Sequence, residues 1–339
     1  MSKKKALITG ITGQDGAYLA KLLLSKGYNV FGGMRENSSN SLWRLQKLNI
    51  DKSVKIIPFE LLEENIINKQ IRHGKFHEIY NFAAQSYVDK SFASPVYTSN
   101  VNALGVIRIL EAIRHFSKST KFFQASSSEM FGNTGHKSRD ENTNFKPISP
   151  YAVSKLHSHW MVNMYREAYN LYCCSGILFN HESPLRGDNY VTQKIIRDLV
   201  RVKMKKLSHI KLGNINVRRD WGYSEDYVHA MWKMLQENKA NDYVISSGHI
   251  YSLKSFINKV SQYLGFKIIW VGKNLNEKGI DKNTNKVIVK IDKKLFRPID
   301  ISYSSGNSSK ARKKLKWKSE TTFGDLIKLM CEAELKKYV

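Results

Sequence analysis

The segment Thr9-Gly-Ile-Thr-Gly-Gln-Asp-Gly16 decides the fold of this chain, because it joins a short apolar run, 4–9, to an apolar-periodic segment, 17–26. This order of strand, glycine-rich turn and helix is the context in which glycines bind the pyrophosphate of a dinucleotide. We expect Gly10 to permit the tight turn, Gly13 to let the backbone approach the pyrophosphate, and Gly16 to let the helix pack on the strand. The N–H groups and positive dipole at the helix start would then face the phosphates.

Strand-like apolar runs and helix-like periodic segments alternate along the first half of the chain. Such alternation indicates a parallel sheet with helices on both faces. We therefore predict an α/β protein with a Rossmann-type, doubly wound parallel sheet. The further expected strands are 28–32, 54–58, 78–82, 121–125 and 173–179, and the expected helices are 62–73, 96–116 and 151–169.

The alternation loosens after Gly187, where polar and basic residues gather, and we expect a second, smaller α/β lobe that binds the substrate. An amphipathic helix is predicted over 220–232. The segment 273–290 is predicted to be a long hairpin or flexible insertion, followed by a helical tail. The expected division is discontinuous: 1–180 and 220–247 form the dinucleotide-binding lobe, and 181–219 and 248–339 form the substrate-binding lobe.

Composition limits the classes to which the protein can belong. The 339 residues include 55 Lys and Arg against 29 Asp and Glu, and the formal net charge of +26 invites a nucleic-acid interpretation. The basic residues are spread along the whole chain, and their clusters carry apolar residues at helical intervals, which favours solvated lysine faces over buried stripes. We therefore expect no nucleic-acid partner. The charge would instead attract an anionic, diphosphate-bearing substrate.

The sequence shows no signal peptide and no window approaching about 18 consecutive apolar residues. We expect a soluble, cytoplasmic protein with no membrane segment. Cys173, Cys174 and Cys331 lack the spacing of metal ligands. Neither a disulfide framework nor a metal site is expected.

A second informative region combines Gln124-Ala-Ser-Ser-Ser-Glu-Met-Phe-Gly132 with Ser149-Pro-Tyr-Ala-Val-Ser-Lys155. Tyr151 and Lys155 are four residues apart in an expected helix, so they lie on one face. The ammonium would stabilise the phenolate and lower the tyrosine pKa from about 10 toward working pH, as a general base requires. Ser127 could hydrogen-bond the same substrate hydroxyl, and Glu129 adds a second proton acceptor.

The choice of cofactor rests on the end of the second expected strand, where Arg35 and Glu36 are neighbours. At this place an acid suits the 2′-hydroxyl of NAD, and an arginine suits the 2′-phosphate of NADP. Arg35 argues for NADP, whereas Glu36 would repel a phosphate. On this local chemistry we predict NADP rather than NAD.

These motifs together resemble the extended short-chain dehydrogenase/reductase superfamily. Over essentially the whole chain, longer strings are similar to the GDP-mannose 4,6-dehydratase family. The resemblance implies a tightly held NADP, a GDP-sugar substrate in the second lobe, and a homotetramer or homodimer that serves deoxysugar biosynthesis. The strings are Asn180-His-Glu-Ser-Pro184, which is the most specific, Arg219-Asp-Trp-Gly222, Asp226-Tyr-Val228, Ala230-Met-Trp232 and Phe296-Arg-Pro298.

The reaction implied by this resemblance is redox-neutral and has three steps. Tyr151 takes the proton of the C4 hydroxyl as a hydride passes from C4 to the nicotinamide. Glu129 then removes the C5 proton, which the new C4 ketone has acidified, and water leaves from C6. The hydride returns to C6 and leaves GDP-4-keto-6-deoxymannose. Proton abstraction beside a carbonyl requires a positioned carboxylate, and Glu129 meets that requirement.

The resemblance also implies binding residues. The sequence departs from the family's pattern at two places. Ser127 replaces the usual threonine, and Glu60-Leu61 replaces the usual pair of an Asp and an apolar residue at the adenine. The implied cofactor residues are Gly10, Thr12, Gly13, Gln14, Asp15, Gly16, Arg35, Glu60, Leu61, Ala83, Tyr151, Lys155, Leu178, His181 and Arg186. The implied GDP-sugar residues are Ser86, Asn180, Thr192, Lys194, Gly213, Arg219, Arg297 and Asp300.

Two alternatives stay open at this point. A relative that acts on a GDP-linked manno-heptose would share every catalytic residue, so the sequence does not separate the two sugars. A non-enzymatic dinucleotide-binding or nucleic-acid-associated protein is the remote alternative. The intact set of Ser127, Glu129, Tyr151 and Lys155 argues against it, since a sensor does not need those side chains.

Overall fold

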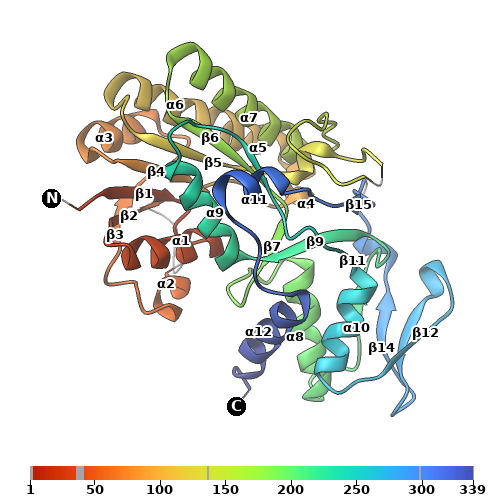
Figure 1. Cartoon of the computed structure of the whole chain (residues 1–339). Helices are drawn as coiled ribbons and strands as arrows, with labels where there is room; N and C mark the ends of the chain where they lie inside the picture. Colours follow the sequence, from red (N-terminus) through yellow and green to blue (C-terminus); the bar gives the residue numbers. More distant parts are fainter. Residues whose placement is uncertain (1–2, 36–41, 136, 298, 339) are drawn as a thin grey trace.

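The computed structural model describes residues 3–35, 42–135, 137–297 and 299–338. Its largest element is a seven-stranded sheet in the order β10-β6-β5-β4-β1-β2-β3, and all neighbouring strands in it are parallel (Figure 1). The predicted Rossmann-type sheet is therefore confirmed. Its strands are β1 (Lys5–Thr9), β2 (Asn29–Met34), β3 (Lys55–Pro58), β4 (Glu78–Asn81), β5 (Lys121–Ser127), β6 (Cys173–Leu178) and β10 (Tyr243–Ile245).

Helices cover both faces of this sheet (Figure 1). On one face Ile8 of β1 belongs to an apolar cluster with Leu19 of α1 (Gln14–Ser25) and Met231 of α9 (Ser224–Gln236). On the other face its neighbour Leu7 packs in a cluster with Ile109 of α6 (Gly105–Phe116) and Val162 of α7 (Pro150–Tyr169). Because successive side chains of a strand point to opposite faces, a strand covered on both sides reads as one continuous apolar run.

The helices around the large sheet come from both ends of the chain. They are α1 (Gln14–Ser25), α2 (Trp43–Lys47), α3 (Glu64–Gly74), α4 (Val88–Ala93), α5 (Pro95–Ser99), η1 (Asn100–Leu104), α6 (Gly105–Phe116), η2 (Ser128–Phe131), α7 (Pro150–Tyr169), α9 (Ser224–Gln236) and α11 (Ser309–Leu315). The last of these contributes Ala311 and Leu315 to the same cluster as α1 and α9. A late segment of the chain thus returns to the first sheet.

A second region contains two further sheets, of order β11-β9-β15 with β7 paired to β9, and β12-β13-β14-β8. Its own core includes Ile196 of α8, Phe256 of α10 and Met330 of α12. In Figure 1 these helices lie at the lower right, away from the large sheet. The elements are β7 (Asn180–Glu182), α8 (Val191–Lys203), β8 (Ile210–Leu212), β9 (Arg218–Tyr223), β11 (Ile250–Ser252), α10 (Leu253–Tyr263), β12 (Ile268–Val271), η3 (Asn274–Asn276), β13 (Lys278–Asp281), β14 (Lys286–Ile291), η4 (Lys293–Leu295), β15 (Tyr303–Ser304) and α12 (Phe323–Leu335).

Two predicted helices differ from the structure. The helix predicted over 220–232 is wrong in its first four residues, because Asp220 lies in β9 and the helix begins at Ser224. The helix predicted over 96–116 contains a π-helical segment, η1. Within η1 the buried Asn102 accepts a hydrogen bond from the Gln85 N–H at 2.8 Å and donates to the Gln85 carbonyl at 2.9 Å. Single-turn π segments of this kind often occur beside functional sites.

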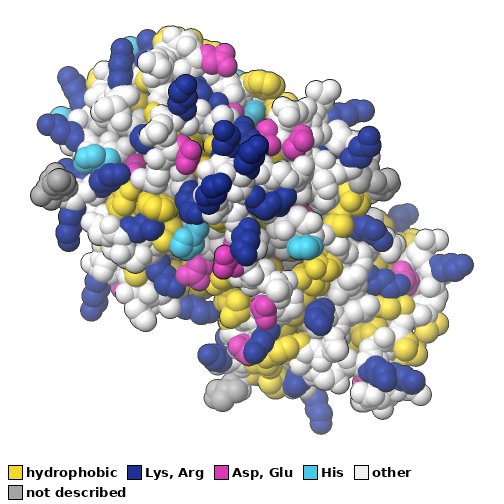
Figure 2. All heavy atoms as spheres, viewed as in Figure 1, with side chains coloured by type: hydrophobic (Ala, Val, Ile, Leu, Met, Phe, Trp, Pro, Cys, Tyr) yellow, Lys and Arg dark blue, Asp and Glu magenta, His cyan; other side chains and the backbone are white. Residues whose placement is uncertain are grey.

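Basic side chains are spread over the face shown in Figure 2 and gather most closely over α9 and α11. The basic residues of α11 are Lys310, Arg312, Lys313 and Lys314. Within the described ranges, no helix is both long enough and apolar enough to cross a membrane.

Candidate active site

A cleft of about 760 Å³ lies where the carboxyl ends of β1, β4, β5 and β6 meet α8, β8 and β9 of the second region. Parallel strands bring their carboxyl ends to one edge of the sheet, and ligands bind at that edge in such folds. Gly10 follows β1, Phe82 follows β4, and Ser127 and Leu178 end β5 and β6. The topology therefore gathers residues that are far apart in the sequence into one cavity.

Ser127, Glu129, Tyr151 and Lys155 all line this cleft. The Ser127 hydroxyl accepts a hydrogen bond from the Glu129 N–H at 3.2 Å, which begins the short helix η2 and fixes the carboxylate relative to the serine. Ser149 caps α7 by accepting from the Ala152 N–H. Ser149 and the proline that follows it fix the start of α7, so that Tyr151 lies in the first turn of the helix.

Lys155 is buried and donates a hydrogen bond to the Ala125 carbonyl at 2.8 Å. Its Nζ lies 5.9 Å from the centroid of the Tyr151 ring. Burial lowers the pKa of Lys155 to about 8. The two side chains share one helix face, as their spacing predicts.

The prediction that Lys155 lowers the pKa of Tyr151 is wrong for this structure. Burial raises the pKa of Tyr151 well above its usual value of 10.0, and a hydrogen bond from Ser127 only partly offsets that rise. The reason is that ionisation would create the phenolate in a desolvated site. The free-energy cost of that desolvation is larger than the stabilisation that the neighbouring groups give to the phenolate. Helical spacing indicates which side chains are neighbours but contains no information about their hydration.

Burial also raises the pKa of Glu129, and nearby Arg219 and Arg297 oppose this rise while Asp300 and Asp89 add to it. A carboxyl group with a raised pKa is a stronger base when ionised than an ordinary surface carboxylate. The site therefore places a half-buried carboxyl group beside the tyrosine and between charges of both signs.

The glycine-rich turn has the geometry that a dinucleotide requires. Gly10 has a φ of +66°, and a Cβ at this position would lie 2.7 Å from the Ala83 nitrogen. A Cβ at Gly16 would lie 2.5 Å from the Gly10 carbonyl oxygen. The helix α1 begins after Gly13 with no side-chain cap, so its first N–H groups remain available to phosphate oxygens. This cradle fits the pyrophosphate of a dinucleotide.

Gln14, Asp15 and His181, all predicted cofactor residues, hold the turn to the strand β7. Gln14 donates to the His181 carbonyl at 2.8 Å, and the His181 Nε2 lies 2.9 Å from an Asp15 carboxylate oxygen. Asp15 raises the pKa of His181 and thereby outweighs the lowering by burial. The His181 ring also stacks on Tyr227, with the centroids 4.8 Å apart. These contacts make the three residues part of the wall of the cleft.

The substrate side of the cleft carries two arginines that share a carboxylate. Arg219 is buried and lies 3.0 Å from an Asp300 oxygen, and the Arg297 guanidinium lies 3.4 Å from the same oxygen. Asp89 of α4 makes a second contact with Arg297, with its Oδ1 atom 2.8 Å from the arginine Nε. Two guanidinium groups held in this way suit a diphosphate, since each presents several donors to phosphate oxygens.

Comparisons with known proteins agree with this geometry. The sequence model of a family described as "GDP-mannose 4,6 dehydratase" matches residues 7–330. A protein of Cricetulus griseus named "GDP-mannose 4,6 dehydratase" is 43% identical over 341 residues, which is 98% of this chain and 92% of that protein. The chain belongs to the GDP-mannose 4,6-dehydratase family. A member from Sinorhizobium fredii is 41% identical and covers 98% of this chain and 97% of its own length.

The fold of this family member is also found in more distant proteins. The dTDP-glucose 4,6-dehydratase of Streptomyces venezuelae, solved with NAD and TYD bound, superposes with a TM-score of 0.82 over 98% of this chain and 97% of that chain. The two sequences are 18% identical, so this likeness concerns the fold. Members of the GDP-mannose 4,6-dehydratase family are nucleotide-sugar hydro-lyases, and the chain is therefore an enzyme of that class.

In this member of the GDP-mannose 4,6-dehydratase family the cleft brings together most of the predicted site residues. Besides the four catalytic candidates, the lining includes Gly10, Thr12, Gly13, Gln14, Asp15, Gly16, Arg35, Leu178, His181 and Arg186 on the cofactor side, and Ser86, Asn180, Thr192, Lys194, Gly213, Arg219, Arg297 and Asp300 on the substrate side.

Three predicted cofactor residues are not among the residues that line the cleft. Leu61 is buried in the apolar core, Glu60 accepts a hydrogen bond from the Leu62 N–H, and the Ala83 N–H donates to the Thr9 hydroxyl. Their contact with the cofactor stays a prediction. Glu36 lies outside the residues that the structure describes.

Sequence reasoning missed several side chains that line the cleft. Arg44 of α2 donates to the Thr12 carbonyl at 2.8 Å and to the Leu185 carbonyl at 2.7 Å, so it joins the glycine-rich turn to the loop after β7. Tyr190 lies under the Arg186 guanidinium, 3.5 Å from its carbon to the ring centroid. A lone arginine or tyrosine in a polar segment carries no periodic signal, so only the folded chain reveals these contacts.

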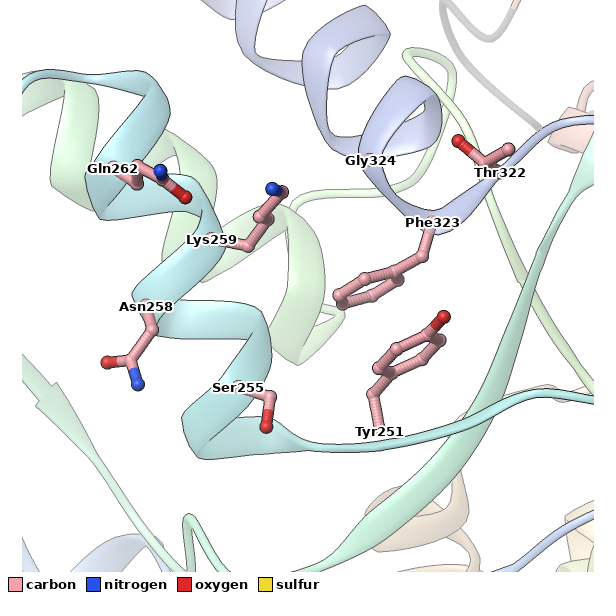
Figure 3. A pocket seen from close by; sticks show the side chains of 8 residues that line it. All are labelled: Tyr251, Ser255, Asn258, Lys259, Gln262, Thr322, Phe323 and Gly324. Carbon is pink, nitrogen blue, oxygen red and sulfur yellow. The ribbon is translucent and has the colours of Figure 1, made fainter.

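A second hollow, of about 490 Å³, lies between α10 and α12 and shares no lining residue with the cleft (Figure 3). Tyr251 and Phe323 stack beside it with their ring centroids 3.8 Å apart. Its lining holds a single charged side chain, that of Lys259. The catalytic candidates of this family member all lie in the larger cleft.

Proposed function

We propose that the protein converts GDP-mannose to GDP-4-keto-6-deoxymannose and water by internal hydride transfer. The observation that carries this proposal is the presence of Tyr151, Lys155 and the half-buried Glu129 in one cleft with the paired arginines of the substrate side. A reductase or epimerase needs the tyrosine and lysine, but the removal of a proton at C5 and of water at C6 needs a further acid–base group. The family model and the relatives named for GDP-mannose support this sugar over a manno-heptose.

Substrate binding is assigned to the charged side chains on the second region. Arg219 and Arg297 would bind the diphosphate, and Asp300 would keep the two guanidinium groups at a fixed spacing. Lys194 donates to the Lys211 carbonyl at 2.8 Å, which holds another cation at this wall. Thr192 donates to Glu182 at 2.7 Å and so fixes the start of α8 at the cleft.

The chemical steps follow from the protein's own groups. Tyr151 would accept the proton of the C4 hydroxyl as a phenolate, and the Ser127 hydroxyl, which lowers the Tyr151 pKa against the rise caused by burial, would stabilise that phenolate. Glu129 would take the C5 proton once C4 is a ketone, and would return a proton to the departing C6 hydroxyl so that water leaves. The raised pKa of Glu129, which desolvation causes, supports both roles, because it makes the carboxylate a stronger base and keeps the carboxyl group protonated to a higher pH than an ordinary one.

The cofactor is proposed to be NADP. When bound, its nicotinamide supplies an acceptor for the hydride of C4 and a donor for C6. Arg35 follows β2 and lines the cleft, where its guanidinium suits a 2′-phosphate. Related folds have been solved with NAD, and one with NADPH, which supports a nicotinamide dinucleotide in general.

We also propose that the protein works as a homo-oligomer, a tetramer or a dimer. The helices α5, η1 and α7 lie side by side and expose Val96, Leu104, Val153 and Trp160. Val96 and Leu104 are about two helical turns apart, and so are Val153 and Trp160. The two members of each pair therefore lie on the same side of their helical segment. Apolar faces of this kind commonly mark interfaces.

The two-lobe division predicted from the sequence stays a proposal. One segment of the predicted second lobe, α11, packs on the first sheet. The cytoplasmic location also stays a proposal.

The test is Glu129→Gln, with Glu63→Gln, an exposed glutamate outside the cleft, as the matched control. We expect Glu129→Gln to retain binding of GDP-mannose in calorimetry. Formation of the product, followed by mass spectrometry as the loss of one water, should fall at least about 100-fold, the contribution typical of a general acid–base group. Turnover equal to that of Glu63→Gln would refute the dehydratase mechanism. GDP-manno-heptose, assayed in parallel, tests the alternative sugar.

A further inference from the structure

Five charged side chains form a cluster on the substrate side of the cleft: Asp89, Glu129, Arg219, Arg297 and Asp300. Asp300 Oδ1 lies 3.0 Å from Arg219 and 3.4 Å from Arg297. Asp89 Oδ1 lies 2.8 Å from the Nε of Arg297. Two guanidinium groups therefore face three carboxyl groups before any phosphate is considered.

Asp89 differs from the other acids in its place and in its exposure. It lies in α4, which follows β4 of the large sheet, whereas Arg297 and Asp300 lie between β14 and β15 of the second region (Figure 1). The Asp89 side chain is 66% exposed, against 24% for Asp300. The ion pair thus joins the two sides of the cleft, and Asp89 is its more exposed partner, at 66% against 33% for Arg297.

Charge balance makes this ion pair matter for binding. A diphosphate brings further negative charge to two guanidinium groups that are already paired with the carboxylates of Asp89 and Asp300. Like charges at these distances repel, so binding is favoured when one carboxylate leaves. Asp300 is held by both arginines, and Glu129 is half-buried with a raised pKa. Asp89 is the member of the cluster that can move away at the smallest cost.

We propose that Asp89 is an internal competitor for the substrate's diphosphate: its carboxylate holds Arg297 across the mouth of the cleft, and a bound GDP-sugar replaces it. The inference rests on the proposed function, in which Arg297 binds the diphosphate. Asp89 is then a positioning residue, because it acts through Arg297. It keeps the guanidinium directed into the cleft and at the same time weakens the binding of every GDP compound, product included, which favours product release.

The first experiment is Asp89→Asn, with binding of GDP and of GDP-mannose measured by calorimetry and turnover measured in parallel. Removing the carboxylate should tighten binding of both ligands by about two- to fivefold, the factor by which partly exposed ion pairs usually shift an equilibrium. The KM for GDP-mannose should fall by the same factor. The asparagine is nearly isosteric and this position is exposed, so folding should be unaffected.

The matched control is Asp188→Asn. Asp188 is also 66% exposed and pairs with an arginine, Arg197, at 3.8 Å, but neither residue lines the cleft. The same loss of a negative charge at this position should leave the affinity for GDP unchanged. An equal gain of affinity in Asp188→Asn would mean that overall charge, and not competition at Arg297, explains the effect, and would overturn the proposal.

Arg297→Ala, alone and combined with Asp89→Asn, separates the inference from the function on which it rests. If Arg297 binds the diphosphate, Arg297→Ala weakens GDP binding, and the gain from Asp89→Asn disappears in the double variant. Unchanged GDP binding in Arg297→Ala refutes the assignment of Arg297 to the diphosphate. Weakened binding in Arg297→Ala together with unchanged or weaker binding in Asp89→Asn refutes the competition and leaves the proposed function intact.

Discussion

Gly10→Ala tests the physical basis of the glycine-rich turn. Gly10 has a φ of +66°, a conformation that costs an L-residue about 1–2 kcal/mol. The new Cβ would also lie 2.7 Å from the Ala83 nitrogen and 2.9 Å from the Phe82 carbonyl carbon. Both are backbone atoms and cannot rotate away, so relieving the contact should cost a further amount of about 1–3 kcal/mol. The expected total loss of unfolding free energy is about 2–5 kcal/mol.

Gly265→Ala separates the two contributions. Gly265 has a φ of +88°, and a Cβ there would have no neighbour within 4 Å. It should lose only the conformational part, about 1–2 kcal/mol. Urea unfolding followed by tryptophan fluorescence measures both variants, and a thermal shift with added NADP reports whether the turn still binds the cofactor. If Gly10→Ala were no less stable than Gly265→Ala, the close approach of the turn to residues 82–83 would not be a constraint.

Two further predictions concern charge. Arg35→Ala should weaken NADP binding by at least about tenfold and NAD binding much less, because only NADP has the 2′-phosphate; equal losses in fluorescence titrations would show that Arg35 does not contact that phosphate. Burial raises the pKa of Asp220 from 3.8 to about 6. Since the folded state then holds its proton to a higher pH than the unfolded state, stability should decline between about pH 4 and pH 6, by a total of about 3 kcal/mol. Asp220→Asn cannot ionise and should show a flatter pH profile in urea midpoints, whereas parallel profiles would contradict the shifted pKa.

The sequence was informative wherever a signal is local and periodic. Gly10 and Gly13 lie between β1 and α1 as predicted, Gly16 lies in the first turn of α1, and the four-residue spacing of Tyr151 and Lys155 places both side chains in the cleft. The alternation of strands and helices was sufficient for the parallel sheet, because a parallel connection requires a crossover helix. Segment 220–223 was misassigned, since β9 ends at Tyr223 and α9 begins at Ser224, so no turn separates the strand from the helix.

The sequence by itself determined the type of sheet, the dinucleotide cradle and the candidates for the catalytic side chains, because these depend on residue type and on spacing along one element. Only the tertiary structure decided the hydration and the charge environment of those side chains. Burial raises the pKa of Tyr151 against the direction expected from Lys155, and Asp89 meets Arg297 across more than half the length of the chain. Both effects depend on which segments approach in three dimensions, and solvation and Coulomb energies depend on that distance and not on separation in sequence.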